Sequence, residues 1–377
     1  MDRLSSLPGD IVLHILSFLD GTKSFVRFSA VSKQWITHLS SLSRDFFFDD
    51  ESLSPSAILE SLESQYVPKI GTFHYTYFPP KQYRREPYEQ VIDFAASRFV
   101  NNLTLDFNYA AGWPGHLMGV LACPSLKTLR LNRCFLDHTF SFPTVTIMHL
   151  ENCYVERFDV HLACPNLKEL CLVDLYHPHI SGMIIKAGPK LVRLSVEYKR
   201  PGQNLLVEST YYAAPKVRGI AKISAPRLEY FRFVVEHSVD MNYFPEVDFP
   251  SLQCAVIDAA HPTGRIDLIK NNQKLSKKLR GERRKQNRFC ISLLKLLQGL
   301  RNAEYLSLSP TLIQALSMLP GIIEQAFQSS PFAGLKTLTL LENPVDMDFL
   351  HIPANALVYL LGGSTSATLQ LPCKREG

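Results

Sequence analysis

Apolar residues recur at helical spacing from Leu4 to Leu42, and this spacing predicts three short helices. In the first helix Ile11 and Ile15 lie on one face, while Val12 begins a second apolar face. Two apolar faces need two neighbours, and chains shorter than about 40 residues generally cannot bury them without outside help. Either the rest of the chain or another protein must therefore cover these helices.

Two blocks of sequence stand out in this segment. They read Leu7-Pro8-x-Asp10-Ile11-x-x-His14-Ile15-Leu16-Ser17-Phe18-Leu19 and Val31-Ser32-Lys33-x-Trp35. Together they resemble the F-box of plant F-box proteins, although Gly9 replaces a common acid and Gln34 a common arginine. The resemblance implies a module that binds a Skp-type adaptor and, through it, a cullin in a ubiquitin ligase.

The resemblance also implies which residues contact the adaptor. They are the apolar positions of the two blocks, namely Leu7, Pro8, Ile11, Ile15, Val31 and Trp35. Interface energy concentrates in a few aromatic and aliphatic residues, so Trp35 and the Leu-Pro pair are the expected anchors. The alternative is a helical cap that only covers the rest of the chain.

A connecting region follows, from residue 46 to residue 98. Asp45–Asp50 predicts one short buried strand, and Ser56–Tyr66 and Tyr88–Phe99 have helical spacing. Pro79, Pro80 and Pro87 interrupt the pattern between them. We expect helices and a strand that link two domains.

A repeat of the form apolar-x-x-apolar-x-apolar, often followed by Asn or Cys, begins at Val100. Its copies start at Val100, Leu126, Val145, Leu167, Leu191, Leu228, Leu252, Ala303 and Leu335. Prolines precede several copies, at Pro124, Pro143, Pro165, Pro189, Pro226 and Pro250. The early spacings fall in the range of about 20–29 residues that is typical of leucine-rich repeats. Each copy can bury its apolar edge only by stacking on the next.

The proline-preceded copies are similar to those of plant F-box/leucine-rich-repeat proteins, including the group with an FBD-type region. The predicted fold class is α/β: a small N-terminal three-helix F-box (1–45), followed by an irregular leucine-rich-repeat solenoid. The repeat domain is expected over 99–377, after the connecting region. The later repeat spacings are longer, which predicts insertions.

The side chains between the core positions of each strand should point away from the core and line the concave face of the solenoid, where such domains bind partners. The candidate substrate-binding residues are Asp106, Arg130, Asn132, His149, Glu151, Glu169, Arg193, Glu197, Tyr230 and Arg232. Their mixed charges favour a protein or peptide over a polyanion. The alternative for each residue is simple solvation.

Composition adds one feature to this picture. The 377 residues carry a net charge of +5, yet Lys270–Arg288 alone holds nine cations and one acid. This run has few apolar residues, so we expect a disordered basic insertion at about 268–289. It could be a nuclear-import signal or a contact for an anion, but a solvated linker is favoured. We expect no nucleic-acid partner, because the run contains no aromatic residues for stacking. No apolar run suits a membrane span, so no membrane partner is expected either.

Candidate chemistry is sparse. His177 and His179 near Cys164 and Cys171 suggest a zinc site, but the repeat pattern already explains most of the thiols, so we expect no metal and no other cofactor. The eight cysteines include no C-x-x-C pair, which favours reduced thiols in the nucleus and/or cytoplasm. We find no phosphate-binding loop, nucleophile elbow or zinc-protease motif, so catalysis is not expected.

The sequence thus predicts a non-catalytic substrate-recognition subunit of an SCF-type ubiquitin ligase, with its F-box on a Skp-type adaptor and its repeats on a protein substrate. Two alternatives remain open. One is a leucine-rich-repeat scaffold without a ligase role. The other is a small-molecule receptor of the same ligase class, which would need a pocket lined by basic residues, and only Arg130, Arg193 and Arg232 are available for it.

Overall fold

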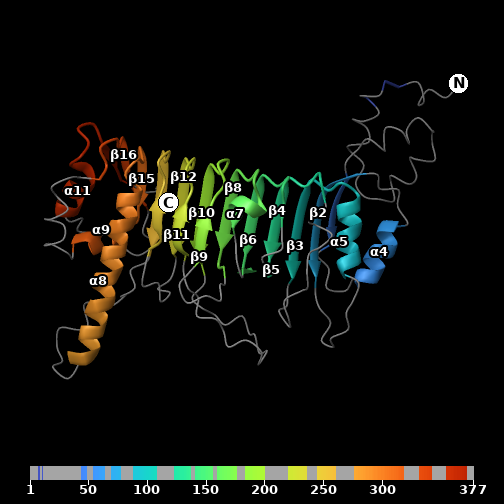
Figure 1. The fold of residues 1–377 in the computed structure, drawn as a ribbon, viewed down its shortest axis with the longest axis horizontal. Helices are drawn as coiled ribbons and strands as arrows, with labels where there is room; N and C mark the ends of the chain where they lie inside the picture. Colours follow the sequence, from blue (N-terminus) through green and yellow to red (C-terminus); the bar gives the residue numbers. More distant parts are fainter. Residues whose placement is uncertain are drawn as a thin grey trace, which may run out of the picture. The chain divides into compact units, whose positions relative to one another are not determined.

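The computed structural model describes residues 7–8, 11, 44–48, 54–63, 69–77, 88–107, 123–136, 141–155, 159–175, 183–199, 220–235, 244–259, 276–317, 331–341 and 354–371. The chain forms two compact units, and Figure 1 labels their helices and strands. Unit 1 contains residues 1–109 and 114–131, and unit 2 contains residues 110–113 and 132–377.

The described part of unit 1 is built on parallel strands with two helices. Strand β1 (Arg44–Phe48) pairs with β2 (Ile70–Tyr77), and β2 pairs with β3 (Asn102–Phe107). Strand β4 (Thr128–Asn132) ends where the unit ends. Helices α4 (Pro55–Glu63) and α5 (Tyr88–Ser97) contact each other, and α5 also contacts β2. Their buried residues join an aromatic core that includes Phe73 and Tyr75.

The main sheet of unit 2 has eight described parallel strands, one for each repeat in the unit and one beyond the last. In spatial order they are β6 (Ile147–Glu151), β8 (Glu169–Val173), β10 (Arg193–Tyr198), β12 (Tyr230–Val235), β14 (Cys254–Ala259), β15 (Tyr305–Leu308), β16 (Thr337–Leu340) and β17 (Thr368–Gln370). Alternate residues such as Leu170, Leu194, Phe231 and Leu306 point into the core and are fully buried.

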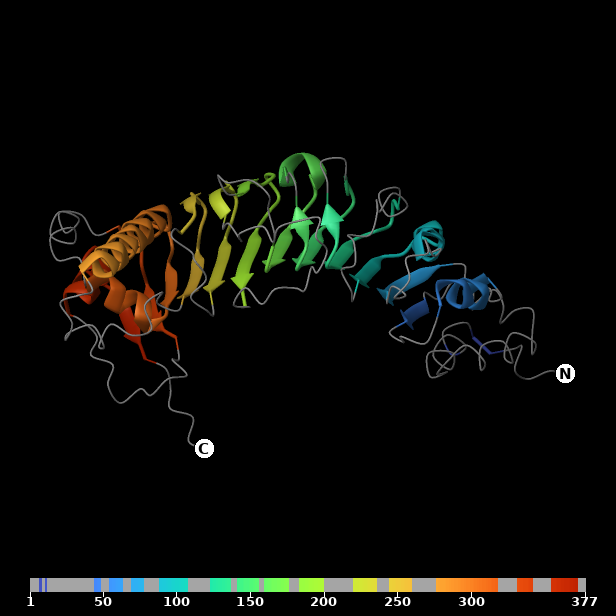
Figure 2. The same ribbon diagram turned by 90° about the horizontal axis from the view of Figure 1, so that it is seen from below.

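A second layer packs behind these strands. It contains two small parallel sheets, β5 (Phe135–Leu136) with β7 (Tyr154–Val155), and β9 (Met183–Lys186) with β11 (Ile220–Ser224) and β13 (Glu246–Asp248). The helices among the described residues of the unit are α7 (Val160–Ala163), α8 (Ser276–Gly299), α9 (Pro310–Ser317) and α11 (Ala354–Leu361). Figure 2 shows the second layer on the outer side of the arc that the strands of unit 2 form. The opposite, inner side of these strands is called the open face below.

Most strands of the repeat begin with the same tight turn. The N–H of Leu167 donates to the carbonyl of Cys164, and the N–H of Leu191 donates to the carbonyl of Gly188, with Pro165 and Pro189 inside the turns. Proline suits the second position of such a turn because its φ is fixed near the required value. After the turn the chain enters the sheet, where the N–H groups of residues 192 and 193 both donate to the carbonyl of residue 168.

The strands of the early repeats end in a second regular turn. Arg133, Asn152 and Asp174 each adopt a left-handed backbone conformation, with φ of 58, 50 and 48°. Their N–H groups donate to carbonyls near the end of the next strand, those of Glu151, Val173 and Glu197 respectively. After two of these turns the thiols of Cys134 and Cys153 are buried, as the repeat pattern predicts.

All nine predicted repeat strands are present, and so are β1, α4 and α5. The fold is therefore a mixed α/β structure with parallel strands, as a leucine-rich-repeat solenoid requires. Strands β2 and β17 and the small outer sheets were not predicted. The three F-box helices lie outside the described residues, apart from residues 7, 8 and 11.

The prediction of a disordered basic insertion at about 268–289 is wrong for residues 276–289, which belong to α8. Lys, Arg, Gln and Glu are good helix formers, and the run continues into an apolar segment that packs on β13 and α9. The packed half nucleates the helix, and the charged half extends it. No described helix is long and apolar enough to span a membrane.

Candidate functional site

The structure describes three of the six predicted adaptor-binding residues. Leu7 is half-buried, Pro8 is exposed, and Ile11 has 47% of its surface exposed. The N–H of Ile11 donates to the carbonyl of Pro8 at 3.0 Å, as in the first turn of a helix that begins with proline. Ile15, Val31 and Trp35 lie outside the described residues.

The open face of unit 2 presents a grid of side chains, because alternate residues of paired parallel strands point the same way. The register places Arg193 beside Glu169 and Tyr230, and Ser195 beside Cys171 and Arg232. His149 of β6 lies beside Cys171 of the neighbouring strand β8. Predicted site residues on four strands are thus brought together.

The grid has a charged half and a neutral half. Strands β6 to β12 carry the charged residues of the predicted site, from His149 to Arg232. The corresponding positions on β14 to β17 carry one charged residue, Asp258, in line with Glu197. The others are uncharged, and they are Cys254, Val256, Tyr305, Ser307, Thr337, Thr339, Thr368 and Gln370. A partner that needs ionic contacts would therefore bind to the first four strands of the unit.

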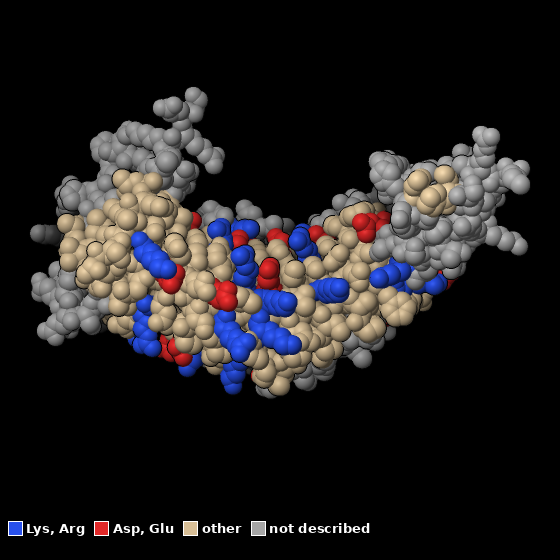
Figure 3. Space-filling view, turned by 90° about the horizontal axis from the view of Figure 1, so that it is seen from above, with Lys and Arg blue, Asp and Glu red and all other residues tan. Residues whose placement is uncertain are grey.

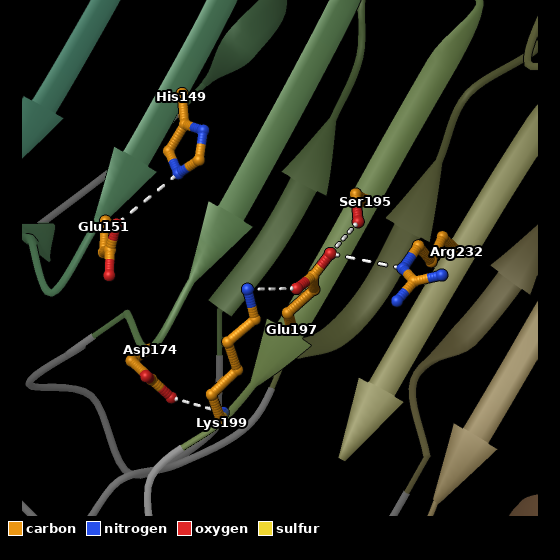
Figure 4. Close-up of polar contacts among 7 residues, drawn as sticks. All are labelled: His149, Glu151, Asp174, Ser195, Glu197, Lys199 and Arg232. Atoms are coloured by element: carbon orange, nitrogen blue, oxygen red, sulfur yellow. Dashed lines mark hydrogen bonds and ion pairs between the residues drawn. The ribbon is translucent and has the colours of Figure 1, made fainter. Parts of the chain in front are cut away.

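Glu197 is the centre of the charged half (Figure 4). Its carboxylate is only 11% exposed and accepts three contacts. The ammonium of Lys199 lies 2.8 Å from Oε2, while Nε of Arg232 and the hydroxyl of Ser195 donate to Oε1 at 3.2 and 2.9 Å. Among these four side chains, two cations contact one carboxylate.

These contacts keep Glu197 ionised. Burial alone raises the pKa of a carboxyl group, but the hydrogen bonds from Lys199 and Ser195 and the charges of Lys199 and Arg232 outweigh burial and lower the pKa of Glu197. The same pair raises the pKa of Lys199, chiefly through its hydrogen bond to Glu197. Glu197 therefore acts as a fixed negative charge that holds Arg232 in place.

Other contacts surround this cluster. Nε2 of His149 lies 3.8 Å from a carboxylate oxygen of Glu151, a pair that is ionic only when the imidazole is protonated. The backbone N–H of Lys199 donates to Asp174 at 2.9 Å. The guanidinium of Arg193 lies 5.3 Å from the ring centroid of Tyr230, which is a cation–π distance.

Three predicted residues do not join this cluster. Asp106 and Arg130 occupy outward positions of β3 and β4 in unit 1, where Asp106 is half-buried and Arg130 exposed. Asn132 accepts a hydrogen bond from the side chain of Asn152 at 3.0 Å. Because Asn152 is buried at the turn after β6, this contact ties two repeats together, and Asn132 has a structural role.

Lys199, Asp174 and Ser195 complete the cluster and were not among the predicted site residues. Lys199 follows Glu197 by two positions, so the alternation that identified Glu197 would have reached it if continued past the end of the repeat. Asp174 occupies the strand-ending turn, and its contact to a residue 25 positions away has no signature in the sequence.

The arrangement is suited to binding rather than to bond chemistry. Burial raises the pKa of the Cys171 thiol, on the open face, to about 11, and that of Cys164 to about 12. Neither thiol is a useful nucleophile at neutral pH. No cluster of three or more His, Cys, Asp or Glu residues occurs in the part of the chain that the structure describes, and His177 and His179 lie outside it.

Comparisons with known proteins indicate the family of the chain. Residues 4–49 match the F-box-like family model. F-box/LRR-repeat protein 25 of Arabidopsis thaliana is 36% identical over 215 residues, which cover 55% of this chain and 81% of the relative. A putative F-box/LRR-repeat protein of the same plant is 26% identical over 95% of this chain and 75% of its own length. An F-box/FBD/LRR-repeat protein of Arabidopsis is 30% identical over 54% of this chain and 51% of its own length.

These matches include both parts of the chain. The family model lies on the N-terminal segment that carries Leu7, Pro8 and Ile11, and a relative with LRR repeats in its name aligns with nearly the whole chain, including the parallel strands of unit 2. F-box/LRR proteins are generally non-catalytic adaptors, and the F-box acts in the ubiquitin pathway. The chain belongs to the plant F-box/LRR-repeat proteins and is related to their FBD-containing group.

Proposed function

We propose that the chain is the substrate-recognition subunit of an SCF-type ubiquitin ligase, acting in the nucleus and/or cytoplasm. Its F-box docks on a Skp-type adaptor, and the adaptor connects it to a cullin. Its repeats hold a protein substrate. The chain performs no bond chemistry itself, because its task is to raise the effective concentration of substrate lysines near the charged conjugating enzyme.

The exposure of Pro8 and Ile11 is the observation that carries the adaptor half of this proposal. If the helices were only a cap on the chain's own repeats, the apolar residues of the first block would be buried. Ile11 instead leaves 47% of its surface uncovered in a segment that matches the F-box-like model. Leu7, Pro8, Ile11, Ile15, Val31 and Trp35 are the proposed contacts.

The substrate half of the proposal rests on the charged half of the open face. His149, Glu151, Glu169, Arg193, Glu197, Tyr230 and Arg232 lie on four adjacent strands of unit 2 and are the proposed substrate contacts there. Arg232 is held by Glu197 through Nε, so the far end of its guanidinium is presented to a partner in a fixed orientation. Asp106 and Arg130 are proposed contacts from unit 1.

Reconstitution with a purified Skp-type adaptor tests the proposal. The double substitution Leu7→Ala and Trp35→Ala should abolish capture of the adaptor, because such anchors contribute about 2 kcal/mol or more each. Ile11→Ala should weaken capture. Ile184→Ala, which removes a similarly exposed isoleucine from β9, should have no effect. Full capture by the double variant, with an unchanged melting transition, would falsify the adaptor assignment.

A further inference from the structure

Exposed cations collect where the strands of unit 2 begin. Lys168 immediately precedes β8, Lys190 lies in the turn before β10, Arg193 is the first residue of β10, and Arg227 lies in the turn before β12. All four side chains are exposed. Figure 3 views this edge from above, and it shows Lys and Arg side chains gathered along it. These four residues are called the strand-start surface.

The backbone fixes the spacing of this surface. The N–H groups of residues 192 and 193 donate to the carbonyl of residue 168, and those of residues 229 and 230 donate to the carbonyl of residue 192. Neighbouring strand starts are thereby held about 4.8 Å apart. The four cations therefore lie within about one screening length of their neighbours at physiological salt and act together on a charged partner.

The charges of the strand-start surface are not neutralised by nearby acids. Some cations elsewhere in the unit are paired, as Lys336 is with Glu304 at 2.7 Å and Lys199 is with Glu197 at 2.8 Å. Within the described part of the chain, none of the four strand-start cations forms an ion pair. Glu169 and Glu229 also lie at these strand starts. Because the four cations outnumber these two acids, the surface keeps a net positive charge.

The positive surface continues onto the open face. Arg193 contacts the ring of Tyr230, which belongs to the neighbouring strand. Two residues after Tyr230 comes Arg232, whose side chain is 41% exposed and whose Nε is held by Glu197. A chain that lies across the strand starts can thus reach Arg232 and enter the charged half of the open face without a break.

We propose that the strand-start surface binds an acidic segment of the protein that the repeats recognise. A run of Asp and Glu side chains can place each carboxylate on a cation while it avoids Glu169 and Glu229. A nucleic acid would set its regular phosphates against these two acids. It would also find only Tyr230 for stacking among the residues named here. The inference depends on the proposed function only in calling the bound protein a substrate.

Fluorescence anisotropy with the full chain, bound to its adaptor, tests this surface. The probe is a labelled peptide of alternating Glu and Gly residues, and the matched probe has Gln in place of each Glu. The Glu peptide should bind more tightly than the Gln peptide by a factor of about ten or more, because its negative charges complement the positive surface. Lys190→Glu with Arg227→Glu should weaken this binding by a similar factor.

The matched control reverses two cations on the outer layer. Lys186→Glu with Lys222→Glu makes the same change of charge at two exposed lysines of β9 and β11, and it should change the affinity less than about twofold. Equal weakening by both double variants, or equal binding of the Glu and Gln peptides, would overturn the inference. The inference would also be overturned if a single-stranded oligonucleotide displaced the Glu peptide from the wild type and failed to bind the variant that carries Lys190→Glu and Arg227→Glu.

Two further measurements keep the result interpretable. If the double variant lost its melting transition, the single substitution Lys168→Glu would replace it, with Lys222→Glu as its control. Capture of the adaptor is measured on every variant and should be unchanged. If the wild-type chain captures the adaptor but does not bind the Glu peptide, only the inference about the strand-start surface is overturned. If it binds the Glu peptide but does not capture the adaptor, only the proposed ligase role is overturned.

Discussion

At the scale of single residues, Glu197 organises the open face. Its nearly buried carboxylate contacts one cation on its own strand, Lys199, and one on the next strand, Arg232. A buried ion is costly unless hydrogen bonds compensate it, and here Ser195 adds one at 2.9 Å. The network therefore stabilises the ionised form of Glu197 and limits the positions that Arg232 can adopt.

Replacing Glu197 with Gln should destabilise the chain by about 1–2 kcal/mol at pH 7, because hydrogen bonds to a charged group are lost. Both cations remain partly exposed and can be solvated, so a larger loss is not expected. Urea unfolding of both proteins measures this difference. Glu169→Gln is the control, since Glu169 is exposed and has no partner among the described residues. It should change stability by less than about 0.5 kcal/mol.

The difference in stability between wild type and Glu197→Gln should also depend on pH. The folded chain lowers the pKa of Glu197 below its value in the unfolded chain, which is about 4.3. Its contribution is therefore complete above that pH, and it disappears as the pH falls through the lower, folded-state pKa. The difference in the free energy of unfolding between wild type and Glu197→Gln should decrease below about pH 4.3. A gap that stayed constant down to the acid transition would contradict this explanation.

Much of the candidate site can be predicted from the sequence, because strand alternation identifies which residues point outward. His149, Arg193, Glu197 and Arg232 follow from that rule alone. What cannot be predicted is which of them pair. Arg232 lies 35 residues after Glu197, and their contact depends on the length of the insertion between two repeats, which the apolar pattern does not limit.

At the scale of elements, the repeat pattern predicts the strands that have the full apolar skeleton and misses those that do not. Strand β2 is buried along nearly its whole length, so it lacks the alternation that marks a half-buried strand. Strand β17 is exposed at all three residues, and it lies in the sheet because β16 offers an edge. Such strands are fixed by their neighbours rather than by their own sequence.

Helix α8 illustrates the opposite error, in which composition suggests less structure than is present. Its charged half has no apolar face to bury, yet it continues a segment in which Phe289, Leu293 and Leu297 are buried. Composition describes a segment as if it stood alone, whereas a helix can be extended from a packed neighbour. The boundary of the insertion therefore could not be set from charge alone.

The end of α8 allows a test of how tightly this helix packs. A Cβ at Gly299 would collide with the backbone carbonyl of Val247 in β13. Gly299→Ala should therefore destabilise the chain by about 1–3 kcal/mol, even though alanine is the better helix former by about 1 kcal/mol. Gly334→Ala is the matched control, because a Cβ there meets nothing within 4 Å.

Thermal and urea unfolding of the two glycine variants measure the difference between them. Destabilisation of Gly299→Ala alone would support close packing of α8 on the second layer. A Gly299→Ala protein as stable as Gly334→Ala would mean that α8 can move away from β13, and the assignment of the helix to the packed layer would have to be withdrawn.

At the scale of the whole molecule, the proposed function assigns two binding tasks to different parts of the chain. The segment that matches the F-box-like model lies at residues 4–49, and the charged half of the open face lies on β6 to β12. The proposed contacts differ in kind, apolar for the adaptor and ionic for the substrate. The central claim is that these two surfaces act independently and that only the first connects the chain to a ligase.

Affinity purification from plant cells, with and without residues 1–45, tests this claim most directly. The full chain should retain a Skp-type adaptor, a cullin and the proteins bound by its repeats. The truncated chain should lose the adaptor and the cullin together and retain the repeat-bound proteins. Recovery of the adaptor and the cullin with the truncated chain would contradict the account.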